Sequence, residues 1–182
     1  MALGTLAEGA DSEGAEGEPA EALDDAPSPI HRVVTIGAVA AHRRLPDGRW
    51  DIALRGLCRA EVVAEASSGE PFRLLQVRRL RERERADDTR LAFELRSAAV
   101  QLANLVPALW AQLNPQLLEA RGPSALADMM AALFIDDAAA RRALIDETRV
   151  GARLERVTEA IAGHLLDLAV RAADRGADRV LH

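Results

Sequence analysis

The side chains that can do covalent chemistry are few in this sequence. Cys58 is its single cysteine, and His42 and Asp47 lie near it along the chain, so the three types needed for a thiol nucleophile and its base are present. In the stretch 50–64, however, every even-numbered residue is apolar, which predicts that Cys58 lies on a buried strand face as a small hydrophobic side chain. We therefore expect no catalysis by Cys58.

The histidines do not indicate a metal site. His31, His42, His164 and His182 are far apart and form no i,i+4 pair beside a carboxylate. A single cysteine can form neither an internal disulfide nor the paired thiolates of a structural zinc site. The chain also has no glycine-rich phosphate loop, so we predict no catalytic, cofactor-binding or metal-binding residue.

All 23 basic residues are arginine, and the chain has no lysine and no tyrosine. Lysine is the phosphate ligand of Walker-type loops, the base of serine–lysine proteases and the nucleophile of Schiff-base enzymes. The residues of this sequence therefore cannot supply any of these three kinds of site.

The overall composition is that of a water-soluble globular protein. Of the 182 residues, 49% are hydrophobic and 29% are charged. No run approaches the roughly 18 apolar residues of a membrane helix, and the first residues lack the basic start and apolar stretch of a signal peptide. We expect a cytoplasmic protein without membrane association.

Charge and periodicity divide the chain into three parts. Residues 1–30 are predicted to hold a first strand and an acidic, flexible loop, since eight acidic residues and no arginine occur there. Residues 31–85 carry 12 arginines against seven acidic residues and form the predicted β-subdomain. Residues 86–182 are predicted to form a helical bundle. The expected fold class is α+β.

The predicted sheet is built from three segments. Residues 33–44 and 50–64 flank the turn sequence LPDG and should form a hairpin, and residues 72–80 supply another strand. Gly56 lies inside the longest strand and suggests a bulge or a sharp bend. Strict alternation would bury Trp50, Ile52 and Leu54 on the same face as Cys58.

Apolar residues beyond Asp88 recur with helical spacing. The predicted helices break near Pro107 and at Gly122–Pro123. Ser124, Asp136 or Asp137, and Thr148 are the expected N-caps of the later helices. The last helix should bury an apolar stripe formed by Val150, Leu154, Val157, Ile161, Leu165 and Leu168.

Several of these segments together resemble the N-terminal domain of the Lon protease and its free-standing relatives, over about residues 30–165. They are IGAVAAHRRLPDGRWDIALRGLCRAEVV with its G-x-x-R strand at Gly56–Arg59, PFRLLQVRRLRE, PSALADMMAALF and ARRALIDETRVGARLERVTEAI. The resemblance implies a PUA-like bent sheet or partial barrel followed by a helical bundle. It also implies recognition of unfolded or damaged protein.

Two departures from Lon proteases give further expectations. Their ATPase and serine–lysine protease domains follow this domain, whereas this sequence ends at His182 and has no lysine, so a stand-alone, non-catalytic module is expected. The family's opening strands, rich in Pro, Leu and Phe, do not precede Met1, so we expect a start codon assigned too late. Missing strands would leave an open edge that favours a homodimer.

The resulting functional prediction is a module that binds exposed or unfolded polypeptide, as a substrate-recognition or adaptor protein working with a separate protease or chaperone. The candidate contacts on the outward face are Arg55, Leu57, Arg59 and Val63. A peptide would pair with an open sheet edge, and the arginines would select acidic segments. The alternative is RNA binding by the basic strands. It is the weaker one, because Trp50 and Phe72 are the only aromatic residues there and Trp50 is predicted to be buried.

Overall fold

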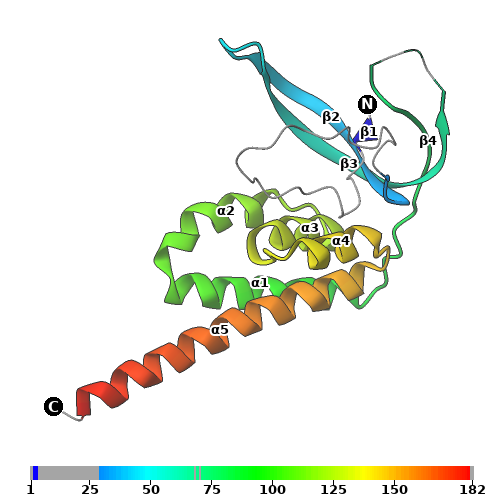
Figure 1. Ribbon diagram of the computed structural model, residues 1–182. Helices are drawn as coiled ribbons and strands as arrows, with labels where there is room; N and C mark the ends of the chain where they lie inside the picture. The colour runs from blue at the N-terminus through cyan, green and yellow to red at the C-terminus, as the bar shows by residue number, and fades with distance from the viewer. Residues whose placement is uncertain (1, 4–28, 68, 70, 181–182) are drawn as a thin grey trace. The chain divides into compact units, whose positions relative to one another are not determined.

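The computed structural model describes residues 2–3, 29–67, 69 and 71–180. The chain divides into two compact units, residues 1–81 and 82–182, which we call the sheet unit and the helical unit. Strands occupy the first and helices the second, so the predicted α+β fold class is confirmed (Figure 1). Each unit is described by itself.

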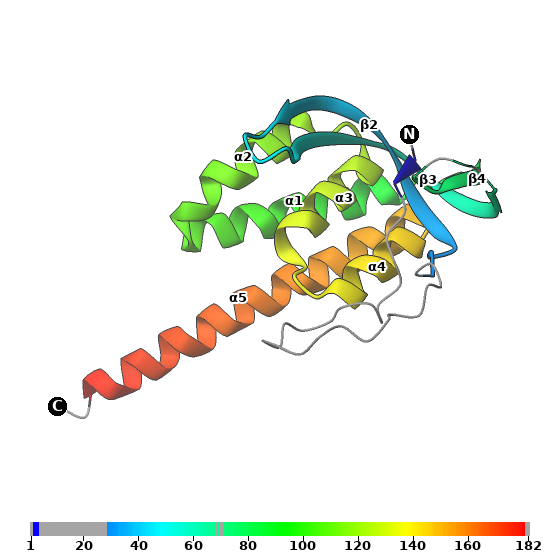
Figure 2. The same ribbon diagram turned by 45° about the horizontal axis from the view of Figure 1, so that its top comes forward.

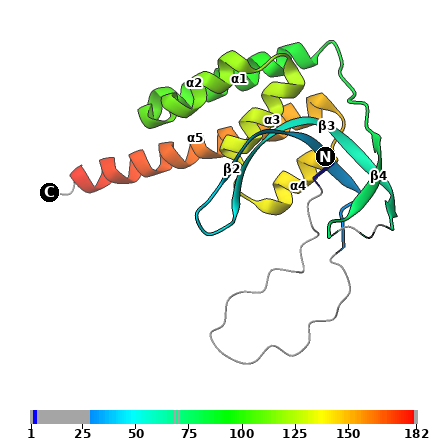
Figure 3. The same cartoon turned by 90° about the horizontal axis from the view of Figure 1, so that it is seen from above.

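The sheet unit holds four antiparallel strands in sequence order: β1 (Ala2–Leu3), β2 (Val33–Arg44), β3 (Trp50–Ala66) and β4 (Leu74–Arg79). The predicted β2–β3 hairpin is present, and it is curved (Figures 2 and 3). Its turn is closed by the Leu45 amide, which donates to the Arg49 carbonyl at 2.8 Å. Gly48 has φ of 90°, a conformation that glycine adopts without a steric penalty.

A bulge at Leu57 changes which side chains share a face of β3. Ile36 pairs with Cys58 and the next residue, Gly37, pairs with Gly56, so Leu57 is an extra residue on β3. An extra residue shifts the alternation of side chains by one position. Trp50, Ile52 and Leu54 therefore lie on the opposite face of the sheet from Cys58, Ala60 and Val62.

This shift corrects the prediction of one continuous buried face on β3. Trp50, Ile52 and Leu54 are 53%, 49% and 48% exposed, whereas Ala60 is fully buried and Cys58 is half-buried. Strict alternation fails because it assumes that no residue is inserted between Trp50 and Ala64.

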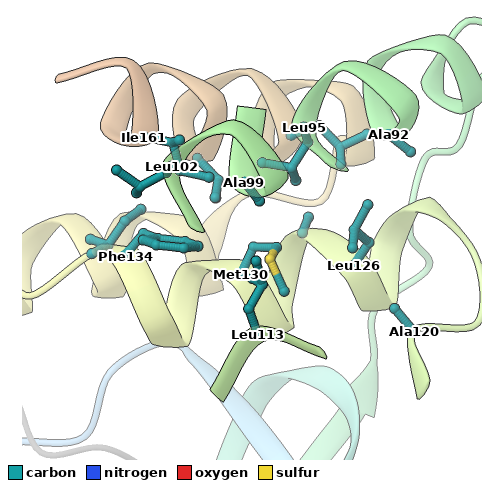
Figure 4. Close-up of a cluster of buried hydrophobic side chains, with 14 of the residues drawn as sticks. Ala92, Leu95, Ala99, Leu102, Leu113, Ala120, Leu126, Met130, Phe134 and Ile161 are labelled. Atoms are coloured by element: carbon teal, nitrogen blue, oxygen red, sulfur yellow. The ribbon is translucent and has the colours of Figure 1, made fainter. Parts of the chain in front are cut away.

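The helical unit contains α1 (Asp88–Leu105), the 3₁₀ turn η1 (Pro107–Leu109), α2 (Trp110–Glu119), α3 (Pro123–Phe134), α4 (Ala138–Asp146) and α5 (Val150–Val180). The predicted breaks at Pro107 and Gly122–Pro123 are confirmed. Figure 4 shows Met130 and Phe134 of α3 facing Leu95 and Leu102 of α1. The first four members of the predicted α5 stripe are fully buried, and α5 extends beyond the other helices (Figures 1 and 2).

Two of the three predicted helix caps differ from expectation. Asp137 caps α4 as predicted, with its carboxylate accepting from the Ala140 amide at 2.6 Å. Ser124 does not cap α3, because Gly122 is the N-cap and the Ser124 hydroxyl instead donates to Glu82. Thr148 was the predicted N-cap of α5, but α5 begins at Val150. Just before this helix, the Glu147 carboxylate accepts a hydrogen bond from the Arg149 amide at 2.8 Å.

The segment just after Arg81 is bonded to the helical unit. The Arg83 amide donates to the Thr148 carbonyl at 2.8 Å, and the Val150 amide donates to the Arg83 carbonyl at 3.1 Å. By contrast, the Leu80 amide donates to Arg59 of β3 at 2.9 Å. The boundary between the units therefore falls at residues 81–82, before the boundary at 85–86 that composition suggests.

Gly151 is required by a close approach between α5 and α1. A Cβ atom at residue 151 would lie 2.6 Å from Asp88 Oδ1 and 3.3 Å from Leu91 Cδ1. Asp88 is buried, and its other carboxylate oxygen accepts from the Arg85 amide at 2.8 Å, so it has little room to rotate. A Gly151→Ala substitution should destabilise the protein by about 1 kcal/mol, because overpacking outweighs the gain in helix propensity.

The matched control for Gly151→Ala is Gly163→Ala in the same helix, where the added methyl group meets nothing within 4 Å. This control should gain up to about 1 kcal/mol from helix propensity alone. Urea unfolding followed by far-UV circular dichroism measures both variants. A stabilised Gly151→Ala protein would show that the Asp88 contact relaxes freely.

Glu147 gives the helical unit an acid-sensitive contact. Its side-chain hydrogen bond with Arg149 lowers the pKa of the Glu147 carboxyl from 4.5 to about 2. The folded-state pKa lies below the unfolded one, so this contact contributes fully above the unfolded pKa and is lost as the pH falls through the folded pKa. The difference in stability between wild type and Glu147→Gln should shrink from about pH 5 to pH 2 in urea unfolding. A constant difference would contradict the assignment.

Candidate functional site

The distal part of the β2–β3 hairpin carries an exposed apolar surface. It is formed by Val39, Trp50, Ile52 and Leu54, which we call the hairpin apolar face. Val39 pairs with Leu54 across the two strands, so their side chains share a face, and alternation adds Ile52 and Trp50. His42 pairs with Ile52, and its ring meets that of Trp50 edge-on at a centroid distance of 5.4 Å. Contiguous exposed apolar groups of this kind mark interaction surfaces.

The same part of the hairpin has open backbone edges. β1 pairs with β2 only at Thr35 and Ile36, and β4 pairs with β3 only from Ala60 onward. Among the described residues, no strand covers the outer edge of β2 at 37–44 or that of β3 at 50–58. Unpaired strand edges can accept an additional strand through backbone hydrogen bonds.

The acidic side chains described in the sheet unit are each bonded to arginine. These pairs are Asp47–Arg49 (2.7 Å), Asp51–Arg43 (2.6 Å), Glu61–Arg32 (2.6 Å), Glu61–Arg78 and Glu65–Arg73 (2.6 Å). Hydrogen bonds from Arg78 and then Arg32 lower the pKa of Glu61, so this carboxylate stays ionised at neutral pH. The acidic groups of the sheet are thereby neutralised locally.

Several arginines of the sheet unit have no such partner. Within the described part of the chain, four have side chains that make no hydrogen bond or ion pair: Arg44, Arg55, Arg79 and Arg81. Arg44 pairs with Trp50 across the strands, and Arg55 pairs with Ala38. The hairpin therefore combines an apolar face with uncompensated positive charge.

The four contact residues predicted from sequence are distributed differently from expectation. Leu57 and Val63 are 55% and 58% exposed, both at register shifts of β3, and Arg55 is exposed as predicted. Arg59 is only 9% exposed, which corrects its predicted outward position. The sequence reasoning missed the hairpin apolar face, although Gly56 beside Leu57 was the signal for the bulge that separates this face from Cys58 and Ala60.

The described geometry provides no pairing for catalysis by Cys58. By register, His42 shares the face of Ile52, whereas Cys58 lies on the opposite face with Ile36. No group of three His, Cys, Asp or Glu residues gathers as a metal site in the described ranges. In the same residues, no helix combines the length and apolarity needed to span a bilayer.

Comparison with known proteins assigns the fold to a family. Residues 13–163 match the family model described as the ATP-dependent protease La (LON) substrate-binding domain. The chain belongs to the LON substrate-binding domain family. The resemblance predicted from the sequence is confirmed, and so is the predicted order of a bent sheet followed by helices.

The relatives of this LON substrate-binding domain include two Lon proteases. That of Trichlorobacter lovleyi is 28% identical over 163 residues, and that of Phenylobacterium zucineum is 30% identical over 149 residues. These matches cover 86% and 80% of this chain, but 19% of either relative, so the chain spans about a fifth of their length.

A solved structure has the same fold. It is the N-terminal domain of the Lon protease from the Mycobacterium avium complex, with a TM-score of 0.61 at 24% identity. The match covers 78% of this chain and 74% of that one. At this identity the likeness shows the fold alone.

Proposed function

We propose that this LON substrate-binding domain is a non-catalytic module that captures exposed or unfolded polypeptide on the hairpin apolar face. The observation that carries the proposal is the half-exposure of Trp50, Ile52 and Leu54 beside open strand edges. Unfolded chains offer apolar side chains and unpaired backbone groups together, which folded surfaces rarely do. In this role the protein is a cytoplasmic substrate-recognition or adaptor protein, and a separate protease or chaperone acts on the captured chain.

The test is binding of fluorescein-labelled, reduced and alkylated α-lactalbumin, followed by fluorescence anisotropy. The permanently unfolded form should bind, and native α-lactalbumin should not compete for the site. The oligomeric state is measured in parallel by light scattering, because pairing of two copies through the open edges would compete with binding. Equal binding of the native and alkylated forms, or of neither, would refute the proposal.

RNA binding remains the second candidate, and one observation strengthens it. Trp50 and Phe72 are both exposed. The predicted burial of Trp50, which counted against base stacking, is therefore not found. The unpaired arginines supply positive charge for phosphate contacts. Retention of single-stranded RNA that falls steeply with salt, without binding of alkylated α-lactalbumin, would favour RNA over polypeptide.

A further inference from the structure

The outer edge of β3 is the better of the two open edges for an added strand. From Trp50 to Gly56 the residues of β3 follow one another without a bulge, and the next bulge is at Leu57. β2 has its own register shift between Val39 and Ala41, which interrupts the corresponding edge. A regular edge aligns its amide and carbonyl groups for successive hydrogen bonds, whereas a bulge breaks that spacing.

The two faces flanking this edge differ in chemistry. On one face lie Trp50, Ile52 and Leu54, all about half exposed. On the other lie Asp51, Ala53 and Arg55. Asp51 is already paired with Arg43 at 2.6 Å, so Arg55 is the uncompensated charge on that face.

We propose that the polypeptide recognised here is an extended strand of alternating apolar and acidic residues, paired with the outer edge of β3 from Trp50 to Gly56. This inference rests on the proposed function and names the substrate class. Successive side chains of an added strand point to opposite faces. Its apolar residues then cover Trp50, Ile52 and Leu54, while its carboxylates meet Arg55.

The test uses Trp50 as the reporter in a Trp110→Phe background, since these are the only two tryptophans. Three short tryptophan-free peptides share one composition of valine and glutamate: one alternates the two residues, one places valine at helical spacing, and one segregates them into blocks. The alternating peptide should shift Trp50 emission to the blue and bind at least tenfold more tightly than the others.

Backbone pairing is tested separately from composition. Two further alternating peptides carry N-methyl groups, one on the odd amides and one on the even amides. An added strand directs only alternate amides toward β3, so one of the two should lose binding and the other should keep it. Equal binding by both would overturn edge pairing.

Arg55→Glu tests the charge, with Arg79→Glu as its matched control. Both arginines are exposed and lack an ion pair among the described residues, but Arg79 lies on β4 opposite Ala60. Arg55→Glu should weaken the alternating peptide about tenfold and Arg79→Glu less than threefold. Equal losses, or a loss confined to RNA retention, would overturn the assignment.

The outcomes separate this inference from the proposed function. If alkylated α-lactalbumin binds but all three peptides bind equally, polypeptide capture stands and the alternating strand is wrong. If neither alkylated α-lactalbumin nor any peptide binds, both are wrong.

Discussion

Replacing Arg153 with alanine is expected to destabilise the helical unit by about 3 kcal/mol. Arg153 is 1% exposed and is among the largest fully buried side chains. Its Nη2 donates to the Ser124 hydroxyl at 2.8 Å and pairs with Glu82 at 3.0 Å, and its Nη1 lies 3.2 Å from an Asp128 oxygen. Truncation removes these contacts and leaves a cavity where α3, α5 and the segment after Arg81 meet.

Methionine at the same position should be tolerated better than alanine. Arg153 Nε has no hydrogen-bond partner among the described residues, and Nη1 has only its ion-pair contact with Asp128, so the native structure already bears the cost of one unsatisfied buried group. Arg153→Met removes that cost and fills most of the space, and buried ion pairs are often replaceable by apolar groups of similar size. We expect a loss for Arg153→Met that is smaller by about 2 kcal/mol than for Arg153→Ala.

Urea unfolding by far-UV circular dichroism measures this series. Arg156→Ala, an exposed position on α5, serves as the control and should change stability by less than about 0.5 kcal/mol. A loss below about 1 kcal/mol for Arg153→Ala would mean that the buried cluster contributes little.

Placing a charge on the hairpin apolar face is expected to weaken capture of unfolded protein strongly. Ile52→Asp should weaken binding of alkylated α-lactalbumin by tenfold to a hundredfold, about 1.4 to 2.8 kcal/mol, because a carboxylate must be desolvated in the contact. The fold should be retained, since Ile52 is half exposed and its substitution leaves no large cavity.

The matched control is Phe93→Asp. Phe93 is 70% exposed on α1, so this variant also replaces an exposed apolar residue by aspartate, but in the helical unit. Binding should stay within about twofold of wild type. An equal loss in both variants would indicate a general effect of negative charge rather than a site on the hairpin.

The sequence alone was sufficient for the elements that depend on local chemistry. Pro107 lacks an amide hydrogen and ends α1, the LPDG turn closes the hairpin, and Asp137 caps the helix that follows it. The α5 stripe was also predictable, because a helix without an inserted residue keeps its period, and Val150, Leu154 and Val157 are fully buried. The order and spacing of sequence segments such as IGAVAAHRRLPDGRW and PSALADMMAALF were enough to suggest the resemblance to the family.

Only the tertiary structure decided what the strands and caps present to their surroundings. Ser124 is a good N-cap by type, but its hydroxyl binds Glu82 and Arg153, which are distant in sequence. On β3 the extra residue Leu57 moves Trp50, Ile52 and Leu54 to the face opposite Cys58, and these predicted buried residues are exposed. Arg59, which was predicted to point outward, is buried together with its neighbour Ala60. A strand's period specifies which residues share a face only between bulges, and whether that face is covered depends on pairings made far along the chain.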